Sequence, residues 1–255
     1  AQNVDKLFFG KNAVLRDEYN RLFASVFVNP DMVKNIVQLL YTRNAGFTRK
    51  EIVEKLEITD GGRLSSNLNA LISSDFIMKY VPFGYGKREE HYKLVDPFCI
   101  FYLHFIWKQK KISEKFWQQN TTSAPVSIWR GFAFENVCFN HIEQIKRSLG
   151  ISGVITETSA WSKKEDDTEG AQIDLLICRN DNVINMCEIK YYSGEFRVTK
   201  SYYEKILRRQ AILAERISPK FAIHSTLITT FGLNYNEYSS AFSNVIVLDD
   251  LFDNV

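Results

Sequence analysis

The sequence predicts a protein of two domains, one α+β and one α/β, and three observations support this expectation. Residues 29–95 contain segments with helical spacing of apolar residues and end in two short segments in which apolar and polar residues alternate. The second half contains apolar strands that precede a helix and a further apolar strand, which predicts a mixed sheet. Between the halves, the polar segment 120–125 lacks apolar periodicity, so we expect a linker there.

Length and composition narrow the class of protein. With 255 residues, 45% of them hydrophobic, the chain is long enough for two cores. The net charge is only +2, so any basic surface for nucleic acid has to be local. There is no apolar run of about 18 residues and no charged-then-apolar start, so we expect a cytoplasmic protein without a membrane segment. The cysteines lack C-x-x-C spacing and are expected to pack in the core rather than bind zinc.

The first half predicts three helices and a hairpin. Asn29, Pro30 and Asp31 form a start signal for a helix over 32–41. Thr48 with Glu51 three residues later predicts a capping box for the next helix. A third helix follows over 63–74, and strands over 76–81 and 91–95 complete the pattern. The apolar face of the third helix is expected to be Leu64, Leu68, Leu71 and Ile72, with Arg63 and Asn67 toward solvent.

Three helices followed by a two-stranded hairpin are typical of a winged helix, whose third helix enters the DNA major groove. We therefore take four residues as candidates for nucleic-acid binding: Arg63 and Asn67 on that helix, and Lys87 and Arg88 in the wing. The same pattern also fits a module that only packs or contacts a protein. A transcriptional regulator would need a dimer interface, and the sequence shows none.

An aromatic-rich segment follows the hairpin. Residues 98–118 carry aromatic side chains at helical spacing, which predicts one long helix that packs between domains rather than a platform for stacking bases. The lysines of this segment are alternative contacts for DNA phosphate. Residues 1–28 also have helical spacing of apolar positions and are expected to form a helical connection.

Charged side chains interrupt two otherwise apolar strands, 172–178 and 183–192, which are joined by a turn at 180–182. Glu188 and Lys190 are two positions apart and emerge on one face, and the neighbouring strand can place Asp174 beside them. An unpaired buried carboxylate costs several kcal/mol, and a cation such as Mg²⁺ is one way to neutralise it. Lys190 would then orient an attacking water or stabilise phosphate charge. The alternative is a solvated hairpin face.

These residues resemble the PD-(D/E)XK, restriction-endonuclease-like phosphodiesterases. Asp174 matches the acid of the first strand and Glu188 to Lys190 match the triplet, although Ile173 replaces the usual proline. Glu135 lies in the amphipathic stretch 129–149, as in the family's leading helix. With a first strand over 154–160, a helix over 199–216, where Gln210 is a further candidate, and a strand over 221–229, the order is α, β, β, β, α, β.

The resemblance implies a metal-dependent DNA nuclease. It implies that Asp174, Glu188 and the Ile189 carbonyl hold Mg²⁺ or Mn²⁺. Glu135 would complete the shell, and Lys190 would position the hydroxide for attack on a phosphodiester. The alternative is a nuclease-like fold that has lost activity and serves as a DNA-binding or protein-binding regulatory module, although the presence of Glu135, Asp174, Glu188 and Lys190 together favours the enzyme.

A second resemblance covers nearly the whole chain. Segments 17–30, 47–52, 92–98 and 170–192 look like the C-terminal half of archaeal-type predicted ATPases of the AAA superfamily, which also occur in bacteria. It implies a preceding ATPase domain as partner. The chain starts at Ala1 and lacks a G-x-x-x-x-G-K-[ST] loop, so we expect an excised fragment without ATPase activity. The expected parts are a connection over 1–28, a winged helix with linker helix over 29–119, and a nuclease-like domain over 126–255.

Overall fold

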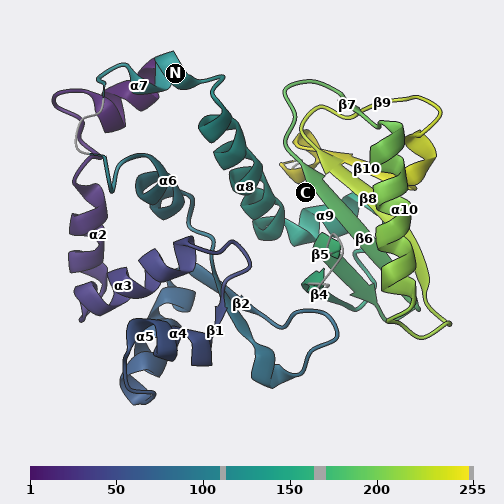
Figure 1. Cartoon of the computed structure of the whole chain (residues 1–255), viewed down its shortest axis with the longest axis horizontal. Helices are drawn as coiled ribbons and strands as arrows, with labels where there is room; N and C mark the ends of the chain where they lie inside the picture. The colour runs from purple at the N-terminus through teal and green to yellow at the C-terminus, as the bar shows by residue number, and fades with distance from the viewer. Residues whose placement is uncertain (110–112, 164–170, 253–255) are drawn as a thin grey trace. The chain divides into compact units, whose positions relative to one another are not determined.

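The computed structural model describes residues 1–109, 113–163 and 171–252, and these form a mixed α/β protein (Figure 1). The chain divides into two compact units. The first comprises 1–80 with 88–132, and the second comprises 81–87 with 133–255. Helix α8, Ala124–Asn140, contains the last crossing between the units.

The first unit contains most of the helices and a three-stranded antiparallel sheet of order β1-β3-β2. The strands are β1 Phe47–Thr48, β2 Ile77–Tyr80 and β3 His91–Leu94, and a 3₁₀ turn occupies Lys87–Glu89. The helices are α1 Gln2–Val4, a π-helical turn Asp5–Phe9, α2 Glu18–Val26, α3 Pro30–Tyr41, α4 Arg49–Leu56, α5 Gly62–Ser73, α6 Pro97–Phe105 and α7 Phe116–Asn120. The three expected helices and the hairpin are therefore present.

Aromatic side chains form much of the core of the first unit. The rings of Tyr19 and Tyr102 stack with centroids 4.3 Å apart, and Phe23 is fully buried between helices. Phe9, Tyr19 and Phe23 come from residues 1–28, so this segment is part of the core. The burial of about 150–250 Å² by each large aromatic side chain makes these residues major contributors to the stability of the unit.

The prediction of one helix over 98–118 is wrong, because α6 ends at Phe105 and α7 begins at Phe116. The apolar spacing does not reveal the break between α6 and α7, since both helices bury aromatic residues in one core. The start of α7 is capped by Asp5, whose Oδ1 accepts from the Trp117 N–H at 2.7 Å and whose Oδ2 accepts from the Gln118 N–H at 3.0 Å. No local sequence pattern reveals a cap that comes from the other end of the unit.

Asn67 corrects a second expectation, because it is buried, with 7% exposure, rather than directed to solvent. Leu64, Asn67, Leu68 and Leu71 have i, i+3, i+4, i+7 spacing and form the buried face of α5, so Asn67 lies within the apolar stripe. Its Nδ2 has no hydrogen-bond partner among the residues that the structure describes. Arg63, on the same helix, donates from Nη2 to Asn29 Oδ1 at 2.8 Å.

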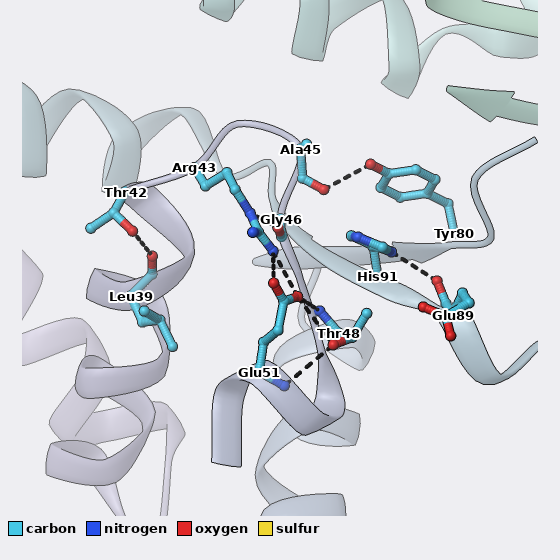
Figure 2. A network of polar contacts seen from close by, with 10 residues as sticks. All are labelled: Leu39, Thr42, Arg43, Ala45, Gly46, Thr48, Glu51, Tyr80, Glu89 and His91. Carbon is cyan, nitrogen blue, oxygen red and sulfur yellow. Dashed lines mark hydrogen bonds and ion pairs between the residues drawn. The ribbon is translucent and has the colours of Figure 1, made fainter. Parts of the chain in front are cut away.

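The predicted capping box at the start of α4 is confirmed, and a third residue extends it (Figure 2). The Glu51 N–H donates to Thr48 Oγ1, and the Thr48 N–H donates to Glu51 Oε2 at 2.8 Å. Arg43 Nη2 donates to both Glu51 oxygens at 2.8 and 2.7 Å, while its guanidinium carbon lies 3.8 Å from the centre of the Phe47 ring. Arg43 Nε also donates to the Gly46 carbonyl at 2.6 Å, so this network connects the α3–β1 turn to α4.

The Glu51 carboxylate makes the stability of the first unit depend on pH. Burial opposes its ionisation, but hydrogen bonds from Arg43 and Thr48 outweigh burial and hold its pKa below the ordinary 4.5. The stabilisation of the first unit by the ionised Glu51 carboxylate is therefore fully present above pH 4.5 and is lost as pH falls through the lowered pKa. We expect Glu51→Gln to cost about 1 kcal/mol at pH 7 and clearly less at pH 3.

Thermal unfolding followed by tryptophan fluorescence in a Trp161→Phe background measures this effect, because the other three tryptophans lie in the first unit. The control is Glu54→Gln, which removes a glutamate charge from the same helix, α4. Glu54 is exposed and lies 3.8 Å from Lys50, so the loss of this surface ion pair should change stability little at either pH. A Glu51→Gln cost that is equal at both pH values would contradict the assignment.

The second unit is built on a five-stranded mixed sheet of order β10-β8-β6-β5-β4. Strands β4, β5 and β6 are antiparallel neighbours, whereas β8 is parallel to both β6 and β10. The elements are α9 Ile142–Ser148, β4 Thr156–Lys163, β5 Ala171–Arg179, β6 Val183–Lys190, β7 Phe196–Arg197, α10 Lys200–Ala214, β8 Ala222–Thr229, β9 Leu233–Asn234, β10 Asn244–Val247 and 3₁₀ turns Ser239–Ala241 and Asp249–Leu251. The expected order α, β, β, β, α, β is confirmed.

Each face of this sheet has its own core. Ile184, Met186 and Leu227 lie in one cluster with residues of α10, such as Ile206. Cys187, Ile189 and Ile228 lie in the other with residues of α8 and α9. The predicted helix over 129–149 is therefore corrected to two helices, α8 and α9, and α8 begins inside the expected linker.

Candidate active site

The three ionic side chains predicted on the strands meet on one part of the sheet. Lys190 Nζ lies 2.8 Å from Glu188 Oε1 and 3.6 Å from Asp174 Oδ2. Glu188 and Lys190 belong to β6, and Asp174 belongs to β5, which is the antiparallel neighbour of β6. The expectation that they emerge together is confirmed, and the alternative of a solvated hairpin face is wrong, because Glu188 is only 3% exposed.

Asp174 lies where β5 stops pairing with β6. The last paired positions are Leu175 and Cys187, and just beyond them Asp174 Oδ2 accepts from the Ile189 N–H at 3.0 Å. The side chain therefore takes the main-chain donor that a continued ladder would have used.

The Asp174 carboxylate carries charge that its surroundings do not fully compensate. Burial and then the negative charge of Glu188 raise its pKa, Lys190 only partly offsets these effects, and the resulting pKa is about 6. Glu135, on α8, also raises the pKa of Asp174, by less than burial and Glu188 do. Two further acids therefore act on Asp174.

Glu188 differs from Asp174, because its surroundings favour the ionised carboxylate. Its Oε1 accepts from the Tyr202 hydroxyl at 2.5 Å and from Lys190, while Oε2 accepts from Arg209 Nη1. Burial opposes its ionisation, but Lys190 and Arg209 outweigh burial and lower its pKa. Burial and Glu188 raise the pKa of Tyr202, so its hydroxyl remains a donor. Glu188 is thus an ionised carboxylate with both oxygens engaged.

Tyr202 and Arg209 were not assigned to the site from sequence. They are seven residues apart on α10, which places them on one face of that helix, two turns from each other. Tyr202 follows Thr199, which caps α10. The signal that could have found them is this spacing on a helix expected to cover the strand that carries Glu188. Gln210, the residue favoured from sequence, instead donates to Ser225 Oγ on β8 at 2.6 Å.

The residues fit a divalent cation in part. Within the ranges that the structure describes, no group of three or more His, Cys, Asp or Glu side chains is arranged to hold a metal ion. At Asp174, the excess negative charge is what a hard cation bound by carboxylate oxygens would relieve. At Glu188, a cation has a place only if the carboxylate gives up one of its present partners.

The four nucleic-acid candidates do not form one surface in the first unit. Arg63 and Asn67 line a hollow of about 410 Å³ beside α5, although Asn67 is buried. Arg88 is exposed in the first unit, whereas Lys87 closes the segment 81–87 of the second. That segment is attached to β4, because the Phe83 N–H donates to the Ala160 carbonyl at 3.2 Å and Ser159 Oγ donates to the Val81 carbonyl at 2.8 Å.

Comparisons with protein-family models, with characterised proteins and with solved structures find no match to this chain. Among the described residues, no helix is both long and apolar enough to cross a membrane. The class of protein that the fold and site define is thus a mixed α/β protein with a buried cluster of acids and cations on its larger sheet.

Proposed function

We propose that the second unit is a metal-dependent phosphodiesterase of the PD-(D/E)XK type that acts on DNA. The observation that carries this proposal is the convergence of Asp174, Glu188 and Lys190 from adjacent strands, with Lys190 Nζ within 3.6 Å of both acids. The sheet in which β6 joins antiparallel β5 to parallel β8, with α10 packed on one face, supports the same assignment.

Each residue of the site would have its own role in the reaction. A bound Mg²⁺ or Mn²⁺ supplies a polarised phosphate and a hydroxide nucleophile near neutral pH. Asp174, Glu188 and the Ile189 carbonyl would hold the ion, and Glu135 would complete the shell. Lys190 would orient the attacking water and stabilise the charge that develops on the phosphate. The Lys190 ammonium suits this role because Glu188 and Asp174 outweigh its burial and raise its pKa, so it remains charged.

The first unit is proposed to be a winged helix that brings DNA to this site. The succession of α3, α4 and α5 and the hairpin β2–β3, with β1 paired to β3, supports this assignment. Arg63 and Arg88 are the proposed phosphate contacts. The proposed partner is an ATPase domain, and the proposed location is the cytoplasm.

A second function is favoured by one specific observation. Both oxygens of Glu188 are engaged by Tyr202, Lys190 and Arg209, as in a structural ion-pair network. A catalytically inactive module that binds DNA or a protein and regulates an ATPase would need such a network for stability alone.

Cleavage of plasmid and branched DNA in Mg²⁺ and in Mn²⁺ separates the two functions. We expect Lys190→Met to reduce metal-dependent cleavage by about 100-fold or more, because it removes the positioned cation of the site. The matched control is Lys205→Met, since Lys205 is an exposed lysine of α10 away from the acids. Cleavage that is equal in wild type and Lys190→Met would contradict the enzyme, and DNA binding without any cleavage would favour the inactive module.

A further inference from the structure

The Glu188 carboxylate has donors on both of its oxygens. A carboxylate has two oxygens with about four positions for hydrogen-bond donors. Oε1 accepts from Tyr202 and Lys190, and Oε2 accepts from Arg209. Two of these donors are cations, so the single negative charge of Glu188 already faces two positive charges.

The ion pair between Glu188 and Arg209 is buried, since the side chains are 3% and 11% exposed. In such surroundings the attraction between opposite charges is weakly screened, and so is the repulsion between like charges. A divalent cation that approaches Glu188 therefore meets the guanidinium of Arg209 at short range. It also has to compete with that group for Oε2.

The acids of the site are thus unequal. Asp174 Oδ2 has the Ile189 N–H at 3.0 Å and a more distant Lys190, at 3.6 Å, as its partners. Glu188 has closer and more numerous donors. A cation can therefore begin to bind at Asp174 without displacing Arg209, whereas ligation by Glu188 requires a change of partner.

Arg209 is the partner that can leave with the smallest rearrangement. Tyr202 lies near the start of α10 and also packs its ring against Phe196, at 5.3 Å between centroids. Lys190 is fixed to β6 beside the acids. The neighbour of Arg209, Gln210, holds the helix to β8 through Ser225, so the Arg209 side chain can rotate while the helix stays in place.

We infer that Arg209 occupies the cation-facing side of Glu188 and has to release Oε2 before Glu188 can ligate a divalent metal ion. Arg209 is accordingly a positioning residue that restrains metal loading. This inference rests on the proposed metal-dependent function of the same site. It predicts that removal of the guanidinium strengthens metal binding, whereas loss of a residue with only a structural role would weaken it.

The test is calorimetric titration of the whole chain with Mn²⁺ in wild type, Arg209→Gln, Arg209→Lys and the control Arg208→Gln. We expect Arg209→Gln to bind Mn²⁺ about tenfold more tightly, equivalent to ~1.4 kcal/mol. Arg209→Lys keeps the positive charge but loses the planar guanidinium group. We expect its affinity for Mn²⁺ to be about threefold higher than that of wild type. Arg208 is exposed on the same helix, so its replacement should leave the affinity unchanged.

The outcomes distinguish this inference from the proposed function. If wild type binds Mn²⁺, Asp174→Ala abolishes that binding, and neither Arg209 variant binds more tightly, the inference fails and the metal site stands. If no variant binds, the metal site and the inference fail together. Binding that appears only in Arg209→Gln supports both. If Arg209→Gln does not fold, as judged by circular dichroism, the Arg209→Lys affinity decides, and an unchanged value overturns the inference.

Discussion

Replacement of Glu188 by alanine is expected to lower the free energy of unfolding of the second unit by about 3–5 kcal/mol. The reason is that Arg209 and Lys190 would lose the carboxylate that compensates their charge, and Arg209 would remain largely buried. Breaking one side of a buried ion pair costs more than its net contribution, because the remaining charge is left unpaired. Hydrogen exchange of the β6 amides under increasing denaturant reports this free energy locally.

The control for this prediction is Glu204→Ala, an exposed glutamate of α10, which should change stability by less than about 0.5 kcal/mol. The double variant Glu188→Ala with Arg209→Met removes both charges of the pair and should recover part of the loss. Equal stability of wild type and Glu188→Ala would show that the network contributes nothing, and would remove the structural argument for the inactive module.

Gly46→Ala is expected to destabilise the first unit by more than about 3 kcal/mol. Gly46 has φ +73°, and a Cβ there would lie 2.1 Å from the Tyr92 carbonyl oxygen. That carbonyl belongs to β3, where Tyr92 pairs with Phe47, so neither backbone can move away without breaking the sheet. The left-handed conformation adds a cost of about 1–2 kcal/mol for any residue with a Cβ.

Gly150→Ala separates these two causes. Gly150 has φ +70°, but a Cβ at that position would have no neighbour within 4 Å. Its replacement should therefore cost only the conformational part, about 1–2 kcal/mol. Chemical denaturation of both variants, with fluorescence for the first unit and hydrogen exchange for the second, gives the comparison. An equal loss of stability in Gly46→Ala and Gly150→Ala would mean that the backbone near Tyr92 shifts to make room for the new Cβ without a cost in free energy.

Local patterns in the sequence predicted the elements that local physics determines. The Thr48–Glu51 box was predictable because capping involves residues three apart, and it is present. The pair Glu188 and Lys190 was predictable because strand alternation fixes which side chains share a face. The turn at 180–182 was predictable from its composition, and Asn182 adopts φ +64° there.

Long-range contacts account for what the sequence did not reveal. The break between α6 and α7 is stabilised by Asp5, which is 112 positions from Trp117. Arg209 reaches Glu188 only because α10 packs on the sheet. The polar side chain of Asn67 predicts a position facing solvent, whereas its helical spacing places it among leucines. In each case the packing partner, rather than the local pattern, decided the outcome.

The segment 81–87 affects how the protein can be divided. The chain leaves the first unit after Tyr80, returns to it at Arg88 and leaves it again after Phe132. A fragment that starts at residue 126 would lack Val81 and Phe83, and with them the hydrogen bonds to Ser159 and Ala160 on β4. Expression of the larger sheet by itself would thus expose an outer strand that its own upstream polypeptide normally covers, a known cause of aggregation in isolated β domains.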